Sequence, residues 1–177
     1  MVRRAAAAFA LLALVVSGSA AVTTAEARTR GGSSMQALQT DLLVQINDLR
    51  RTHGLVPLRL STKLSLAAHQ HSSEMAGRGY FSHSSADGSR FDRRIARFYP
   101  MGRYRYWSVG ENLLWSSPDV DARGALQMWM NSPEHRANLL TARWRQIGLS
   151  AIHSASAPGT YGGREVTIVT SDFGIRR

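Results

Sequence analysis

Three side chains that can bind a metal ion or transfer a proton occur in well-separated segments of the sequence. His83 lies in a polar loop, Glu111 lies in a turn next to a glycine, and His135 lies in the first turn of a predicted short helix. Neutral imidazoles and carboxylates are common zinc ligands and also common proton-transfer groups. No short ligand spacing links the three residues, so they could equally be polar surface groups or hydrogen-bonded structural residues.

The composition indicates a single domain that can bury a core. The chain has 177 residues, of which 44% are hydrophobic and 19% are charged. It contains no cysteine, which excludes a disulfide scaffold, thiolate metal sites and a thiol nucleophile. The formal net charge is +10, and Lys63 is the only basic residue that is not an arginine. This strong arginine bias is typical of genome base composition, so a partner does not have to explain each arginine.

The N-terminus has the pattern of a secretory signal peptide. A positive start at residues 1–4 precedes an apolar run at residues 5–16, and Ala25-Glu26-Ala27 forms a small-x-small cleavage site. The apolar run is too short to span a bilayer core of about 30 Å, although a buried alanine-rich helix has a similar composition. We therefore expect residues 1–27 to be removed, and the mature chain, residues 28–177, to be secreted, extracellular and not transmembrane.

The rest of the chain has helical patterns first and strand patterns later. Residues 28–37 are expected to be a flexible lead-in, with the domain proper over residues 38–177. Helical periodicity begins at Met35 and ends at Gly54. Further helices are predicted over residues 61–78, 90–97, 118–130 and 133–140, and strands over residues 104–115, 145–153 and 165–173. This order favours a layered α+β domain, with the last two strands paired if residues 154–163 form a hairpin loop.

Two features beside the candidate site have simple structural interpretations. His71 shares the apolar face of the second helix, which indicates a core histidine or a histidine on the floor of a cleft. Residues 90–107 interleave arginines with aromatic side chains, a pattern that can bind polyanions. For an exported protein we expect an anionic envelope polymer or lipid there and no nucleic acid. The alternative is a solvated arginine-rich face.

Several motifs, in order, resemble those of the CAP superfamily. That superfamily comprises cysteine-rich secretory proteins, antigen 5 and pathogenesis-related 1 proteins, and is also called SCP-like. The resemblance covers about residues 38–174. The chain has no cysteine, and in this it resembles the bacterial members of the superfamily. The matching segments are residues 47–50 (NDLR), 54–58 (GLVPL), 67–76 (AAHQHSSEMA), 80–83 (YFSH), 110–112 (GEN), 129–140 (WMNSPEHRANLL), 147–148 (IG) and 172–174 (DFG).

The resemblance implies a three-layer α-β-α sandwich around a central antiparallel sheet, with a central cleft. His83, Glu111 and His135 match residues that line this cleft, and in some members the two histidines bind zinc or another divalent cation. Glu111 would complete a His₂Glu ligand set or accept a hydrogen bond from metal-bound water and act as a base. It is therefore the candidate catalytic residue.

The sequence departs from the family pattern at one cleft position. Ser132 stands where the family has a second cleft glutamate, and Glu134 is a possible substitute that also suits a helix N-terminus. Asn112 and Asn138 are expected to support the site. The predicted function is a secreted CAP domain whose cleft binds a divalent cation or small ligand. The alternatives are a metal-assisted extracellular hydrolase and a module that binds lipid or the cell envelope.

Overall fold

The computed structural model describes residues 20–177, with side chains from residue 34 onward. Residues 1–19 of the predicted leader lie outside the described residues, so its removal stays a prediction. The helices are α1 (Ala20–Thr52), α2 (Thr62–Arg78), α3 (Phe91–Phe98), α4 (Ala122–Asn131) and α5 (Pro133–Leu139). The strands are β1 (Arg59–Leu60), β2 (Trp107–Ser116), β3 (Gln146–Ala157) and β4 (Arg164–Arg176).

The sheet has the strand order β1-β3-β4-β2. β3 and β4 form the predicted antiparallel hairpin. Every residue of β2 pairs antiparallel with a residue of β4. β1 is a two-residue strand that pairs parallel with β3, and the sequence patterns did not predict it. This order leaves β2, which carries Glu111, at an edge of the sheet.

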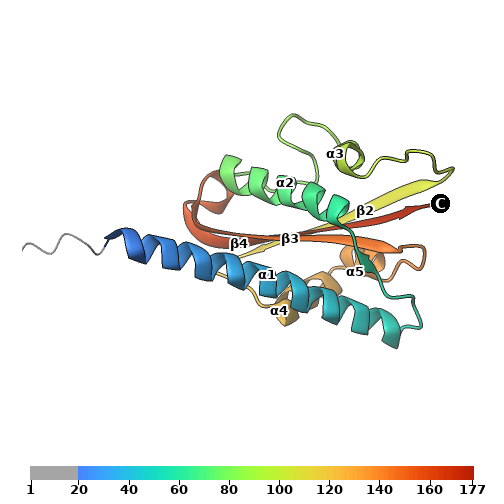
Figure 1. Ribbon diagram of the computed structural model, residues 1–177, viewed down its shortest axis with the longest axis horizontal. Helices are drawn as coiled ribbons and strands as arrows, with labels where there is room; N and C mark the ends of the chain where they lie inside the picture. The colour runs from blue at the N-terminus through green and yellow to red at the C-terminus, as the bar shows by residue number, and fades with distance from the viewer. Residues whose placement is uncertain (1–19) are drawn as a thin grey trace, which may run out of the picture.

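Helices cover both faces of the sheet, which confirms the α+β class and the three-layer sandwich (Figure 1). Successive side chains of a strand point to opposite faces. In β4, Ile168 packs with Met75 of α2 in one core cluster, whereas Val169 packs with Leu42 of α1 in the other. A third cluster joins α2 to Ile95 of α3. The layer formed by α2 and α3 therefore faces the even-numbered residues of β4.

The first helix is longer than its apolar pattern predicts. α1 begins at Ala20 rather than near Met35, so the segment expected to be a lead-in, residues 28–37, has helical backbone. No proline interrupts the sequence between these two starts, and backbone hydrogen bonding continues through the polar stretch. Among the described residues, no helix combines the length and the hydropathy required to cross a membrane.

The helices after β2 are set by their caps. α4 begins at Ala122, four residues later than predicted, because the Asp121 carboxylate accepts a hydrogen bond from the backbone N–H of Gly124 at 2.7 Å. Ser132 lies between α4 and α5, and Pro133 occupies the first position of α5, as predicted. This tight connection places His135 in the first turn of α5, close to β2.

Candidate functional site

Glu111 and Asn112 lie within the edge strand β2, so the prediction that Glu111 lies in a turn is wrong: the pairing of β2 with β4 continues through both residues. Because strand side chains alternate, Glu111 points toward the layer of α2 and α3 and Asn112 points toward α5. The Glu111 side chain is completely buried. A buried carboxylate needs hydrogen-bond donors. Two side chains provide them: His83 in the loop after α2, and Arg94 in α3.

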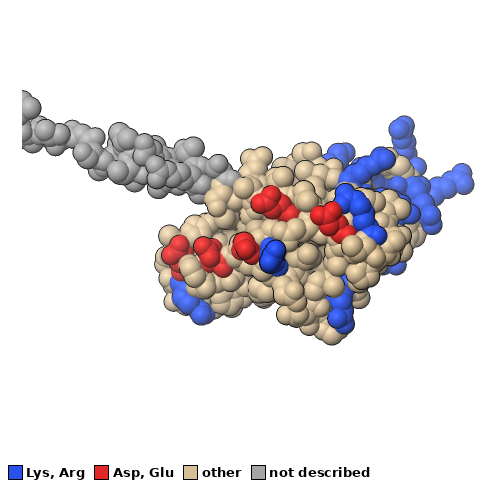
Figure 2. All heavy atoms as spheres, turned by 90° about the horizontal axis from the view of Figure 1, so that it is seen from below, with Lys and Arg blue, Asp and Glu red and all other residues tan. Residues whose placement is uncertain are grey.

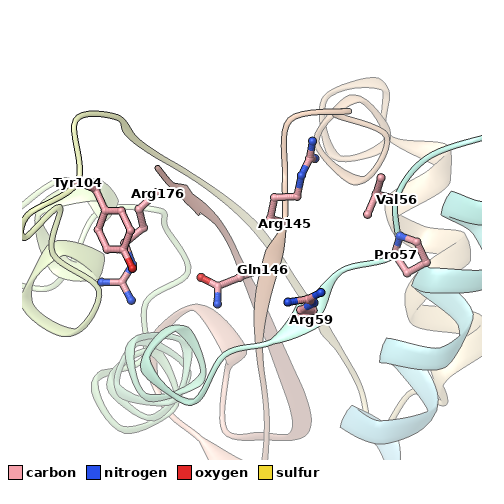
Figure 3. A pocket seen from close by; sticks show the side chains of 7 residues that line it. All are labelled: Val56, Pro57, Arg59, Tyr104, Arg145, Gln146 and Arg176. Carbon is pink, nitrogen blue, oxygen red and sulfur yellow. The ribbon is translucent and has the colours of Figure 1, made fainter.

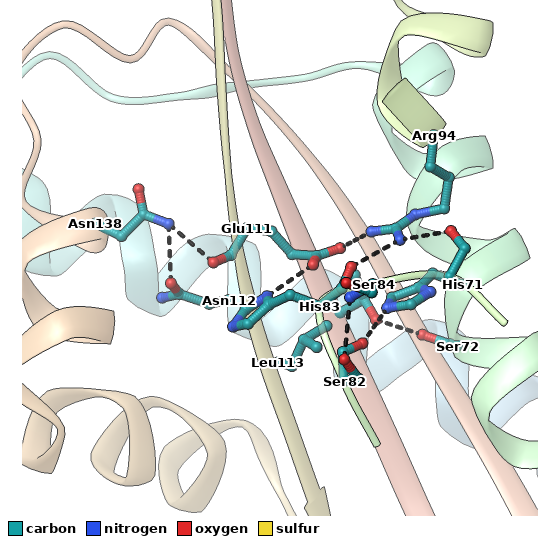
Figure 4. A network of polar contacts seen from close by, with 12 residues as sticks. His71, Ser72, Ser82, His83, Ser84, Arg94, Glu111, Asn112, Leu113 and Asn138 are labelled. Carbon is teal, nitrogen blue, oxygen red and sulfur yellow. Dashed lines mark hydrogen bonds and ion pairs between the residues drawn. The ribbon is translucent and has the colours of Figure 1, made fainter. Parts of the chain in front are cut away.

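The loop between α2 and α3 brings His83 to Glu111. The Nδ1 atom of His83 lies 2.8 Å from Oε1 of Glu111, and 52% of the His83 side chain remains exposed (Figure 4). An ionised carboxylate only accepts hydrogen bonds, so Nδ1 carries the proton that it donates. The neutral ring then has its other nitrogen, Nε2, free as a lone-pair donor.

Arg94 holds the other side of the Glu111 carboxylate. Its guanidinium donates to Oε2 of Glu111, to the backbone carbonyl of His83 at 3.1 Å and to the Ser85 hydroxyl at 3.2 Å. The Arg94 side chain is completely buried, so the expectation that residues 90–107 form a basic outer face is wrong for this arginine. The sequence did not predict this role of Arg94, because it does not show which of the neighbouring arginines of a short helix faces the sheet.

Two buried side chains fix the loop that carries His83. Nε2 of His71 lies 2.8 Å from the Ser82 carbonyl, and the Tyr161 hydroxyl donates to the Tyr80 carbonyl at 2.9 Å. His71 is fully buried on the inner face of α2, which confirms the interpretation made from the sequence. Burial lowers the pKa of His71, and its Nδ1 atom has no hydrogen-bond partner among the described residues. The neutral ring therefore anchors the loop directly before His83.

A second buried carboxyl lies beside Glu111. Asp172 is the register partner of Glu111 across β2 and β4, and it is completely buried. Neither of its oxygens has a hydrogen-bond partner in the described chain. Burial, and secondarily the charge of Glu111, raise the pKa of Asp172 well above its usual value. One buried cation, Arg94, thus pairs with Glu111, and of the two buried carboxyl groups Asp172 is the one whose pKa burial raises.

His135 reaches the site from the opposite layer. Its backbone carbonyl accepts a hydrogen bond from the Asn112 side chain at 3.0 Å. The Asn138 amide donates to the Glu111 carbonyl at 3.1 Å and to the Asn112 side chain at 2.9 Å. Burial, and then the charge of His83, lower the pKa of His135. Asn112 and Asn138 therefore tie α5, which carries His135, to β2, whereas His83 contacts β2 from the layer of α2 and α3.

An apolar pocket of about 270 Å³ adjoins His135. Phe81, Leu114, Trp115 and Met128 contribute apolar walls, and Ser132 and His135 provide polar groups. The pocket runs beside the free edge of β2. Ser132 thus lies in the wall of a pocket that can accept a nonpolar group.

The predicted site residues do not all meet. Glu134 is exposed and has no hydrogen bond or ion pair with the described residues. Within the described part of the chain, no three His, Cys, Asp or Glu side chains are grouped closely enough to hold a metal ion together. The two carboxylate oxygens of Glu111 contact His83 and Arg94. The rings of His83 and His135 each keep a nitrogen atom that makes no hydrogen bond with residues 34–177.

Comparison with known proteins agrees with this architecture. The family model named CAP, cysteine-rich secretory protein family, matches residues 43–173. YkwD, an uncharacterized protein of Bacillus subtilis, is 31% identical over 129 residues, which are 72% of this chain and 48% of YkwD. This chain therefore spans about half the length of that relative.

Solved structures show the same fold. An extracellular protein of Bacillus anthracis with an SCP domain has a TM-score of 0.61 and 26% identity, over 81% of this chain and 41% of that one. An outer surface protein of Borrelia burgdorferi has a TM-score of 0.60 and 20% identity, over 78% of this chain and 92% of that one. The range matched by the family model contains β1, β2, β3 and most of β4. The chain belongs to the CAP family of cysteine-rich secretory proteins.

Proposed function

We propose that the cleft beside β2 binds a small ligand or a divalent cation through the imidazoles of His83 and His135. The observation that supports this most directly is the bond between Nδ1 of His83 and Glu111 at 2.8 Å, which leaves Nε2 of a half-exposed ring free. Metal-binding histidines generally donate their second ring nitrogen to such a carboxylate or carbonyl.

The residues around the imidazoles would set their protonation and orientation. Glu111 fixes the His83 ring, and Arg94 pairs with the buried Glu111 carboxylate. The lowered pKa of His135 favours its neutral, ligand-binding form at neutral pH. A divalent cation held by the two imidazoles would polarise an oxygen atom of a bound ligand.

The apolar pocket indicates the class of ligand. Trp115, Leu114 and Phe81 would cover a nonpolar group, while His135 would contact a polar group at the same end. We therefore propose a ligand that has a nonpolar portion and a polar or metal-binding head. The pocket volume of about 270 Å³ suits part of such a molecule rather than a whole polymer.

Glu111 is better suited to positioning than to base catalysis. A hydrolase mechanism would need one Glu111 oxygen to accept a proton from water, but His83 and Arg94 occupy one oxygen each. The metal-assisted hydrolase stays an alternative proposal, and it would require turnover that disappears with a chelator and with Glu111→Gln.

Secretion is also part of the proposal. It is supported by the leader pattern at residues 1–27 and by the similarity to a bacterial protein described as extracellular. Binding to an anionic envelope polymer or lipid stays a further proposal. It is supported by the basic side chains, nearly all of them arginines in this sequence, that gather at one end of the molecule (Figure 2).

Zinc titration by calorimetry tests the role of the two histidines. We expect wild type to bind zinc and His83→Ala/His135→Ala to lose at least about tenfold in affinity. The matched control, His53→Ala/His69→Ala, removes two exposed imidazoles outside the cleft and should bind like wild type. Glu111→Gln should weaken binding by about 10–100-fold, since it replaces the carboxylate that orients His83 by a neutral amide with one acceptor oxygen instead of two. Equal losses in the two double variants would overturn the cation proposal.

A further inference from the structure

A second cavity lies away from the histidine pair, where β1, β3 and β4 meet. It has a volume of about 350 Å³ and includes Arg59 of β1, Arg145 just before β3 and Arg176 at the end of β4 (Figure 3). These arginines are far apart in sequence and come together because Arg59 pairs in register with Gln146, which itself pairs with Gly174. The convergence is therefore a property of the sheet.

None of the three arginines has an anionic partner in the described part of the chain. No Asp or Glu lines the cavity, and Arg59, Arg145 and Arg176 are absent from the ion pairs among residues 34–177. Buried Arg50 adds to the positive charge nearby. Its pKa is lowered by burial and then by the charge of Arg145. The cavity thus concentrates positive charge without an internal counterion.

Two of the guanidinium groups are held in place by backbone and aromatic groups. One nitrogen of Arg145 donates to the Ala142 carbonyl at 2.8 Å and to the Trp144 carbonyl at 2.9 Å. Arg176 donates to the Pro100 carbonyl at 3.0 Å. It also stacks 3.9 Å from the centre of the Tyr99 ring. A guanidinium has five N–H donors, so each keeps several for a ligand.

Neutral donors complete the wall of the cavity. The Gln146 side-chain oxygen accepts from the Tyr99 hydroxyl, which leaves the Gln146 amide nitrogen to donate elsewhere. The Tyr104 hydroxyl has no hydrogen-bond partner among residues 34–177. Val56 and Pro57 form an apolar rim on the side of the cavity opposite Tyr104 and Arg176 (Figure 3).

We propose that this cavity binds the phosphate group of a phosphate ester. A phosphate offers several anionic oxygens to arginines that approach from different directions, and guanidinium forks match its geometry. A phosphate ion alone would not fill about 350 Å³, so the remaining space fits an ester substituent against Val56 and Pro57. The source is a free phosphate ester or a lipid headgroup. The site does not depend on the cation proposal for His83 and His135.

Calorimetric titration with glycerol 1-phosphate and with inorganic phosphate tests the site. Wild type should bind both, and Arg59→Gln/Arg145→Gln/Arg176→Gln should lose at least about tenfold in affinity, since charge-assisted bonds to phosphate are lost. The matched control, Arg93→Gln/Arg123→Gln/Arg136→Gln, removes the same charge from exposed arginines outside the cavity and should retain binding. His83→Ala/His135→Ala should also retain it.

A second experiment distinguishes a free phosphate ester from a lipid headgroup. Sedimentation with phosphatidylcholine vesicles, with and without phosphatidylglycerol, should show retention on the anionic vesicles if the headgroup is the source. Failure of wild type to bind any of these phosphates, or equal losses in both triple variants, would overturn the proposal. If the cavity triple variant does not fold, Arg59→Gln alone serves instead, because that side chain makes no hydrogen bond with residues 34–177. It should reduce affinity severalfold.

Discussion

Replacing Arg94 by methionine should destabilise the fold strongly, although it changes one residue on a short helix. The Arg94 side chain is completely buried and bonds to Glu111, to the His83 carbonyl and to the Ser85 hydroxyl. Methionine has a similar length and no charge, so it keeps much of the packing and removes the cation. The Glu111 carboxylate would then remain buried beside Asp172, without the cation that pairs with it.

The magnitude follows from the loss of one partner of a buried ion pair. Such a loss typically costs about 3–5 kcal/mol, because the remaining charge is uncompensated. In a domain of this size, about 1 kcal/mol corresponds to a change in Tm of about 2–4 °C. A loss of about 4 kcal/mol therefore lowers Tm by about 8–16 °C. The exposed neighbour Arg93 has no ion pair among the described residues, so Arg93→Met should change stability by less than about 0.5 kcal/mol.

Urea denaturation and thermal melting measure the energetic coupling between Arg94 and Glu111. The set is wild type, Arg94→Met, Glu111→Gln and the double variant, with Arg93→Met as the control. Because each single variant leaves a buried partner behind, the double variant should lose about 0.5–3 kcal/mol less than the sum of the singles. Additive losses, or an Arg94→Met variant as stable as Arg93→Met, would refute the buried arrangement.

The remaining predictions concern pH and packing. Because the pKa of His71 is lowered, its contribution to stability is complete above the ordinary value of 6.5 and is lost as pH falls. The free energy of unfolding should drop on acidification, and His71→Gln should reduce that drop in denaturation series at several pH values. At Gly148, an added Cβ would lie 2.1 Å from the Leu64 carbonyl carbon. Gly148→Ala should therefore destabilise by more than about 2 kcal/mol in urea denaturation. Gly77 has open space and lies inside α2, so Gly77→Ala should stabilise by about 0.5–1 kcal/mol.

Local patterns in the sequence were enough to predict most elements. The apolar periodicity of α2 predicted its bounds within one residue. The strand patterns of the last segments predicted the hairpin, because alternation and turn residues are local properties. The two-residue strand β1 has no such pattern. It forms only because β3 offers a free edge beside it.

For the candidate site, residue types together with the resemblance to CAP proteins pointed to His83, Glu111 and His135 as candidates, but not to the residues that support them. Adjacent residues Arg93 and Arg94 differ completely in burial, and the docking angle of α3 decides which of them faces Glu111. Similarly, Asp172 meets Glu111 only through the register of β4 with β2. A register is set by the whole length of the paired strands.

The sequence by itself determined the family, the order of helices and strands, and the three residues around which a cleft was expected. The tertiary structure decided which charges are buried, that Glu111 orients His83, and that Arg59, Arg145 and Arg176 surround one cavity. The physical reason is distance along the chain. Periodicity and capping depend on a few neighbouring residues, whereas electrostatic environments depend on groups brought together by strand register and helix docking.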